Sequence, residues 1–152
     1  KGWRDTGKHI LLCPSSETVT FHLNGISQKE WVEIAKQEIR KHTDREIRFR
    51  NKPRPGNEWW NTDIKEDLKG AHCLVTNMSL AGIDAVINMT PVICHQRNIC
   101  SFISSRDIKY IKKPMRPGGK TITEWLKMIA DNQFTLEEMR NGIAYEVLKK
   151  QV

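Results

Sequence analysis

CLVTNMSLAGIDAVINMTPVIC, residues 73–94, contains two apolar runs separated by a stretch of small residues. The first run leads into Asn77 and Ser79, the middle stretch carries the single acid Asp84, and Pro91 opens the second run. Short apolar runs of this kind are typical of buried parallel strands, which a crossover helix must connect. The stretch therefore predicts strands at residues 71–76 and 91–94, with a helix between them at about residues 79–88.

The rest of the chain alternates in the same way. We expect further strands from His9 and at residues 46–50, a weaker strand at residues 108–111, and helices from about Ser27 and near residues 63–68. Capping boxes at Thr121 and Thr135 predict two closing helices. The sequence thus predicts a three-layer Rossmann-like α/β fold, with an open, mostly parallel sheet of about five strands in a single domain, residues 1–152.

Composition narrows the function classes. No apolar run approaches the ~20 residues that a membrane span needs, and the N-terminus has no signal-peptide h-region, so we expect a cytoplasmic chain. The four cysteines have no CxxC or zinc-type spacing, which predicts reduced, buried thiols and no metal site. The chain opens abruptly, only a few residues ahead of its first strand, as expected of a domain cut from a longer protein.

The charge favours anionic partners. The formal net charge is +7, and cations crowd two stretches, residues 45–54 and 109–120. Nucleotides, phosphosugars and nucleic acids are the partners that such an excess attracts, although a solvated surface explains any single lysine equally well.

Polar side chains follow each predicted strand. Ligands of open parallel sheets bind outside the carboxyl ends of the strands, so these side chains are the candidate site. They are Ser15 and Ser16, Arg50 and Lys52, Asn77 and Ser79, and His95 with its neighbours Gln96 and Arg97. Hydroxyls, amides and cations with few acids predict a phosphate-binding rim rather than a magnesium site.

Each candidate has a functional and a structural explanation. Ser79 is expected to cap the helix, where unpaired N–H groups can hold a phosphate. Asp84, about one and a half turns further on, either accepts hydrogen bonds from a ribose or is an ordinary first-turn acid. Arg50 and Lys52 project the same way from an extended strand, toward a phosphate or toward solvent. His95 lies at a strand end without a visible catalytic partner.

Several catalytic motifs are absent from the sequence. It contains no Walker-type glycine-rich loop, no GxGxxG, no HExxH and no GxSxG. These absences argue against P-loop nucleotide hydrolases, dinucleotide dehydrogenases, zinc proteases and α/β-hydrolases.

The run from Val75 to Ser79, the pair Asp84-Ala85 and the run Pro91-Val92-Ile93 resemble the nucleotide-sugar half of GT-B glycosyltransferases. The closing stretch, Trp125 to Tyr145, is similar to short phage-encoded proteins of this type, which implies the host cytoplasm. By this resemblance Ser79 binds the donor diphosphate, Asp84 the donor ribose, and Arg50 with Lys52 the phosphates as the sugar leaves, without a metal or cofactor.

The chain also departs from that family. Met89 stands where the family usually has Gly, and Asp84 replaces the commoner Glu. GT-B enzymes place the acceptor site on a separate N-terminal domain, which nothing here supplies. The resemblance therefore implies an excised donor-binding half, a partner that contributes the other half, or a fold reused for binding only.

The sequence leaves three functions open. The first is the donor domain of a sugar transferase that acts on nucleic acid or nucleotide acceptors. The second is a nucleotide-cleaving enzyme of the nucleoside deoxyribosyltransferase type, in which Asp84 is a nucleophile or stabilises an oxocarbenium ion. The third is a basic module without enzymatic activity that binds nucleotide or nucleic acid through residues 109–120.

Overall fold

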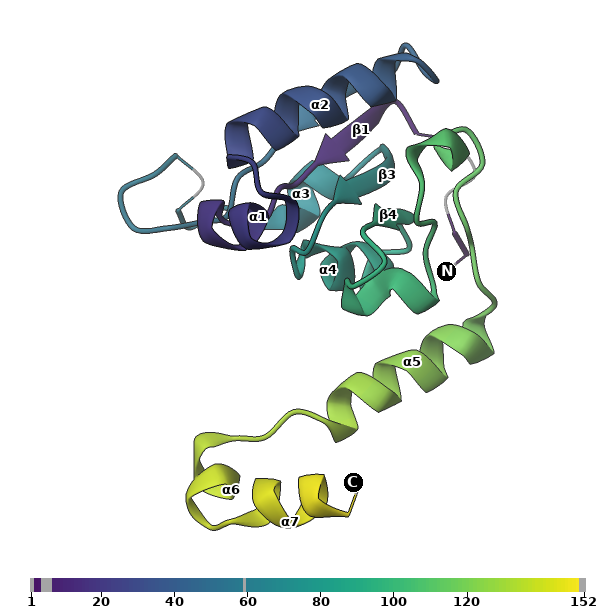
Figure 1. Cartoon of the computed structure of the whole chain (residues 1–152). Coiled ribbons are helices and arrows are strands. Elements are labelled where there is room, and N and C mark those ends of the chain that lie inside the picture. The colour runs from purple at the N-terminus through teal and green to yellow at the C-terminus, as the bar shows by residue number, and fades with distance from the viewer. Residues whose placement is uncertain (1, 4–6, 59, 151–152) are drawn as a thin grey trace. The chain divides into compact units, whose positions relative to one another are not determined.

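The computed structural model describes residues 2–3, 7–58 and 60–150. The chain divides into two compact units, residues 1–117 and residues 118–152 (Figure 1). The sequence predicts a single domain, and the division into two compact units does not decide this point, so the single domain stays a prediction. Within the described ranges, every helix is too short or too polar to cross a membrane.

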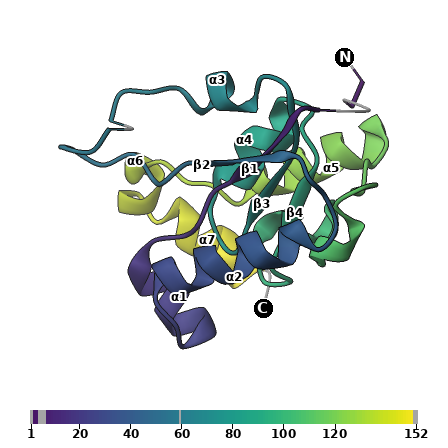
Figure 2. The ribbon, with the colours of Figure 1, turned by 90° about the horizontal axis from the view of Figure 1, so that it is seen from above.

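A four-stranded parallel sheet forms the centre of the first unit. Its strands are β1 (His9–Leu12), β2 (Glu46–Phe49), β3 (Ala71–Thr76) and β4 (Val92–Cys94), in the order β2-β1-β3-β4. Figure 2 shows the strands following one another in this order. The chain moves outward from β1 to β2 and then returns to the other side of β1 with β3. The strand order therefore reverses between β1 and β3, as the Rossmann-like prediction requires.

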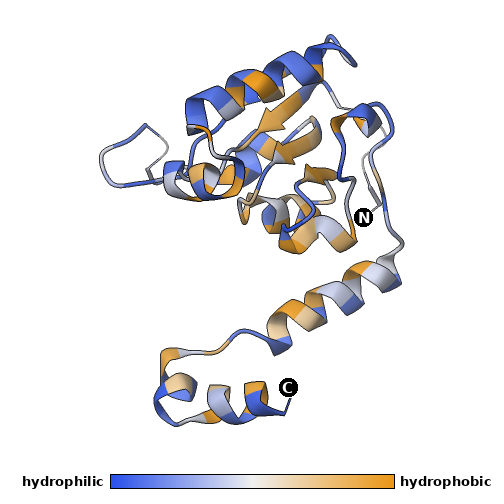
Figure 3. Cartoon of the chain, in the orientation of Figure 1, coloured by the Kyte–Doolittle hydropathy of each residue, from blue (hydrophilic) through white to orange (hydrophobic). Residues whose placement is uncertain are grey.

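Helix α2 (Gln28–Arg40) covers one face of this sheet. Its buried side chains Val32, Ala35 and Ile39 pack in one cluster with Ile10 and Val75 of the central strands. Ser27 caps the helix in the predicted capping box, since its side chain accepts from Glu30 N while Glu30 bonds back to Ser27 N. Figure 3 shows hydrophobic strands beneath a helix whose outer face is hydrophilic.

The opposite face is covered by α3 (Ile64–Leu68) and α4 (Ala81–Ile87) (Figure 1). Gly82 lets α4 approach the short 3-10 helix η1 (Ile99–Phe102), because a Cβ at this position would lie 2.8 Å from Cys100 Sγ. All four cysteines are buried and free, as the sequence predicted.

Two elements of the first unit differ from the sequence-based expectations. The fifth strand predicted at residues 108–111 is wrong: residues 108–110 form a 3-10 helix, η2 (Ile108–Tyr110). The Asp107 side chain accepts a hydrogen bond from Lys109 N and thereby starts this helical turn. Helix α1 (Glu17–Asn24) was not predicted; Ser16 caps it, and it ends at Gly25, whose φ is 70°.

The second unit consists of α5 (Gly119–Asp131), α6 (Leu136–Arg140) and α7 (Ile143–Lys149). The capping box predicted at Thr121 is wrong, because the N-cap of α5 is Gly118, three residues earlier. The capping box at Thr135 is confirmed. Behind it the helical segment is divided at Gly142, whose φ of 76° ends regular helix geometry.

Candidate functional site

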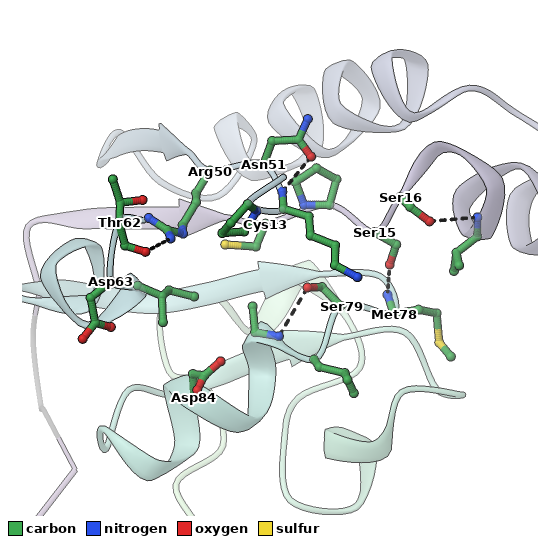
Figure 4. A pocket seen from close by; sticks show the side chains of 17 residues that line it. Cys13, Ser15, Ser16, Arg50, Asn51, Thr62, Asp63, Met78, Ser79 and Asp84 are labelled. Atoms are coloured by element: carbon green, nitrogen blue, oxygen red, sulfur yellow. Dashed lines mark hydrogen bonds between the residues drawn. The ribbon is translucent and has the colours of Figure 1, made fainter. Parts of the chain in front are cut away.

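A cavity of about 430 Å³ opens beyond the carboxyl ends of β1, β2 and β3. It is called the strand-end cavity below. Its walls are the loops that follow these three strands, together with the start of α3 and the first turns of α1 and α4 (Figure 4). It lies where the strand order reverses, the position at which open α/β sheets bind their ligands.

Six of the eight predicted site residues line this cavity. They are Ser15, Ser16, Arg50, Lys52, Ser79 and Asp84. The sheet topology brings them together from the loops after β1, β2 and β3 and from α4, which are far apart in sequence. Asn77 and His95 are not among the lining residues.

Asn77 holds the cavity wall together from within. It is 2% exposed; its Oδ1 accepts from Ser15 N at 2.7 Å, and its Nδ2 donates to Thr20 Oγ1 at 3.1 Å. Its own carbonyl accepts from Asn98 Nδ2 at 3.1 Å, and the same amide group reaches the Ser79 carbonyl at 3.3 Å. Asn77 therefore ties the loop after β1 to the loop after β3.

Three serine hydroxyls face the cavity, and backbone amides fix their oxygens. Ser15 Oγ accepts from Met78 N at 2.9 Å, Ser16 Oγ from Val19 N at 3.4 Å, and Ser79 Oγ from Ala81 N at 3.3 Å (Figure 4). A hydroxyl that accepts in this way keeps its own O–H for another acceptor. Together the three serines can offer three O–H donors to a ligand.

The expected helix cap at Ser79 is displaced by one residue. Leu80 occupies the N-cap position of α4 and makes no side-chain capping bond. The Ala81 amide already donates to Ser79 Oγ, and α4 is only seven residues long. The donors of this loop are therefore better represented by the Ser79 hydroxyl than by a helix N-terminus.

Arg50 is engaged within the protein. The side chain is buried; Nη1 is ion-paired with Asp67, and Nη2 donates to the Thr62 carbonyl at 2.9 Å (Figure 4). These bonds attach the end of β2 to the start of α3. We expected Arg50 and Lys52 to project the same way, toward a phosphate or toward solvent. Their surroundings differ, because Lys52 is exposed and belongs to no ion pair of the described residues.

Two carboxylates lie at the end of the cavity away from Ser16 (Figure 4). Asp63 caps α3, its Oδ1 accepting from Lys65 N at 2.9 Å, and Asp84 comes from α4. Desolvation, and then the nearby charge of Asp63, raise the pKa of Asp84 above its ordinary value. The rim is therefore less purely cationic than predicted: one exposed lysine and three hydroxyls face two acids.

Cys13 also lines the cavity, but it is not a nucleophile at neutral pH. Burial raises the pKa of its thiol to about 12, which leaves the side chain protonated. Within residues 2–3, 7–58 and 60–150, no three Cys, His, Asp or Glu side chains cluster as metal ligands would.

His95 lies outside the cavity, in the turn after β4. Its Nδ1 accepts from Arg97 N at 3.2 Å, and its backbone N donates to the Asn77 carbonyl at 3.3 Å. These bonds give His95 a place in the turn that supports the Asn77 loop.

Sequence reasoning missed several residues that shape the site. Asp63 reaches the cavity from the long connection between β2 and α3, which no strand-end rule covers. Gln28, behind the Ser27 cap, donates to the Ser15 carbonyl at 2.5 Å and to Asn51 Oδ1 at 3.3 Å. The signal for Gln28 was its position at the start of α2, beside the same sheet edge.

Comparison with known proteins gives no match to a protein-family model, a curated protein or a solved structure.

Proposed function

We propose that the strand-end cavity binds a nucleoside diphosphate or a nucleotide sugar. The observation that carries this proposal is that Ser15, Ser16, Ser79 and Lys52 line one cavity, whose end away from Ser16 holds Asp63 and Asp84. Hydroxyl donors and an exposed ammonium group suit phosphate oxygens, whereas carboxylates suit sugar hydroxyls.

The phosphates would lie at the serine end. Lys52 supplies the positive charge there, because Arg50 is already engaged with Asp67 and the Thr62 carbonyl. The serine oxygens are fixed by backbone amides, so binding would require little reordering of the loops. Arg50 acts as a positioning residue that holds the start of α3 against the end of β2.

The nucleoside would lie toward the carboxylates. Asp84 accepts readily from ribose hydroxyls when it is ionised, and Asp63 provides a second acceptor at the same end. The apolar side chain of Ile64, next to Asp63, also lines the cavity, whereas those of Val19, Met78 and Leu80 belong to the serine end. A flat nucleobase can bury a face against the Ile64 side chain.

The donor half of a GT-B glycosyltransferase is the function that this arrangement supports best. In such an enzyme the site must stabilise the charge that develops on the diphosphate as the sugar leaves. In this proposal Lys52 and the three serine hydroxyls stabilise that charge. The resemblance of residues 75–93 to that family points in the same direction, and the acceptor would come from another domain or partner.

Isothermal titration calorimetry with UDP, GDP and a UDP-sugar tests the proposal. We expect binding of at least one nucleoside diphosphate, weakened about tenfold or more in Lys52→Ala, since a charged hydrogen bond contributes about 1.5–3 kcal/mol. Ser79→Trp should abolish binding by filling the cavity. Lys41→Ala is the matched control, because Lys41 follows the far end of α2. Equal affinities for Lys52→Ala and the control would contradict the proposal.

A second function is favoured by one observation, the pairing of Asp63 and Asp84 in the same cavity with a raised pKa of Asp84. Two acids beside a sugar can cleave the bond between sugar and base. The base leaves with a proton, and water or a second base takes its place at the sugar carbon. Release of free base from a nucleoside, lost in Asp84→Asn, would establish this reaction in place of the first.

A further inference from the structure

A second cavity, of about 470 Å³, lies beside the edge of the sheet that β4 forms. It is called the β4-edge cavity below. Ser105 pairs with Ile93 of β4; Cys94 N donates to the Ser105 carbonyl at 3.0 Å, and Ser105 N donates to the Val92 carbonyl at 3.1 Å. The cavity lies beside this segment, and none of its lining residues lines the strand-end cavity.

Hydrogen bonds hold the segments around this cavity, residues 101–106 and 110–115, in place. Ser105 Oγ accepts from Met115 N at 2.9 Å, which fixes the returning segment against the sheet edge. His72 Nε2 donates to the Ile111 carbonyl at 2.7 Å from within β3. Arg106 Nε donates to the Ser101 carbonyl at 3.1 Å, so its guanidinium is held at the cavity. Hydrogen bonds therefore fix the conformation of this surface.

Two aromatic rings of this cavity are exposed to solvent. Phe102 is 72% exposed, the largest value among the large hydrophobic side chains of the described residues, and Tyr110 is 52% exposed. Lys109 Nζ lies 5.1 Å from the centroid of the Tyr110 ring. Large apolar side chains left in water at a cavity are typical of binding surfaces.

The same surface is strongly basic. Residues 101–116 contain five Lys and Arg side chains and one acid, Asp107. Asp107 is occupied, because it is ion-paired with Lys109 at 3.0 Å and caps η2. Lys112 and Lys113 are exposed and take part in no ion pair of the described residues. An anionic ligand would therefore meet cations that pair with no acid in the described part of the chain.

We propose that the β4-edge cavity binds single-stranded nucleic acid. Phe102 and Tyr110 stack on unpaired bases, while Arg106, Lys112 and Lys113 contact the phosphates, which is how sequence-tolerant single-strand sites are built. A duplex hides its bases from the rings, and an acidic peptide leaves the rings without stacking partners. This inference does not depend on the strand-end cavity, and it provides a place where a nucleic-acid acceptor could dock.

Fluorescence anisotropy of a labelled oligothymidylate, titrated with the whole chain at several salt concentrations, tests the site. We expect affinity to fall with salt, and Lys113→Gln to reduce the slope of log K against log salt by about 0.7. Phe102→Ala and Tyr110→Ala should each weaken binding roughly tenfold. Phe21→Ala and Lys29→Gln, exposed changes on α1 and α2, should leave binding unchanged.

Three results would overturn the proposal. One is the absence of binding at low salt. Another is equal affinity for the duplex or for polyglutamate, which would assign the surface to polyanions in general. The third is loss of binding in Lys52→Ala, or displacement by saturating UDP, with Phe102→Ala unaffected, which would move the oligonucleotide to the strand-end cavity. Circular dichroism on each variant verifies that the chain is folded.

Discussion

The two cavities of this protein are constructed in different ways. The strand-end cavity is held together by polar side chains, above all the buried Asn77 and the buried Arg50 with its partner Asp67. The β4-edge cavity instead exposes Phe102, Tyr110 and Lys113 on a segment whose backbone bonds to the core. Changes near the first cavity should therefore lower stability as well as binding, whereas changes at the second should affect binding alone.

The largest effect is expected from Asn77→Ala. The substitution leaves Ser15 N and Thr20 Oγ1 without their buried partner, which should lower the free energy of unfolding by about 3 kcal/mol. Urea unfolding monitored by circular dichroism measures this loss. Asn88→Ala, which removes a single bond to the Asp84 carbonyl at the end of α4, should cost less than about 1 kcal/mol. Similar losses for the two variants would contradict the role given to Asn77.

Asp67→Ala should have the next largest effect. It leaves the buried Arg50 guanidinium with an unpaired charge, and we expect a loss of about 2 kcal/mol, because Asp67 itself is partly exposed. The double variant Arg50→Met/Asp67→Leu removes both charges and should recover much of this loss. Thermal and urea unfolding of both variants tests the pair. A double variant less stable than Asp67→Ala would show that Arg50 stabilises the loop by other bonds.

Lowering the pH should destabilise the core at His72, which bonds to the segment beside the β4-edge cavity. Burial lowers the pKa of His72 below its ordinary value of 6.5, and its buried Nδ1 has no hydrogen-bond partner among the described residues. The unfolded state then binds a proton near pH 6.5 while the native state does not. Stability should fall as the pH drops below about 6.5, by at most about 1.4 kcal/mol per pH unit.

The pH dependence of unfolding, measured with and without His72, checks this assignment. His72→Gln should flatten the stability profile between pH 6.5 and 5, whereas His22→Gln, on the exposed surface of α1, should leave it unchanged. The protection factors of the amides of Ile111 and its neighbours, which are corrected for slower intrinsic exchange in acid, should fall as the pH drops, because protonation puts a charge on the buried ring that bonds to the Ile111 carbonyl. An unchanged profile in His72→Gln would show that other groups dominate.

The smallest effect on stability is expected at the β4-edge cavity. Phe102→Ala and Tyr110→Ala remove exposed rings, so each should change the free energy of unfolding by less than about 0.5 kcal/mol. Urea unfolding measures this change. A loss of 2 kcal/mol in either variant would mean that the ring packs for stability, and the contrast between the two cavities would then disappear.

The sequence predicted the centre of the fold better than its edges. The strands beginning at His9 and Ala71 were recognisable because buried parallel strands are apolar throughout and bounded by polar residues. Helix α1 was missed, because Thr18, Val19, Thr20 and Phe21 are poor helix formers and Thr20 is its only buried residue. The run at residues 108–111 has the apolar content of a short strand, but it forms a 3-10 helix that the Asp107 side chain caps.

The site followed the same division. Residues placed directly after strands, such as Ser15 and Ser79, were predicted to meet, because parallel strands end at one edge. The burial of Arg50 depends on Asp67, which lies seventeen residues further along the chain in α3. Tertiary packing decides how the segment between β2 and α3 runs, and therefore that Asp63 lines the cavity. Local sequence patterns do not encode this packing.

The most direct test of the strand-end cavity as a nucleotide site is an NMR titration of the ¹⁵N-labelled chain with UDP. We expect saturable changes in the chemical shifts of the amides around Ser15, Ser16, Lys52 and Ser79, and no change at residues 101–115. Shifts confined to residues 101–115, or none at all, would contradict this expectation.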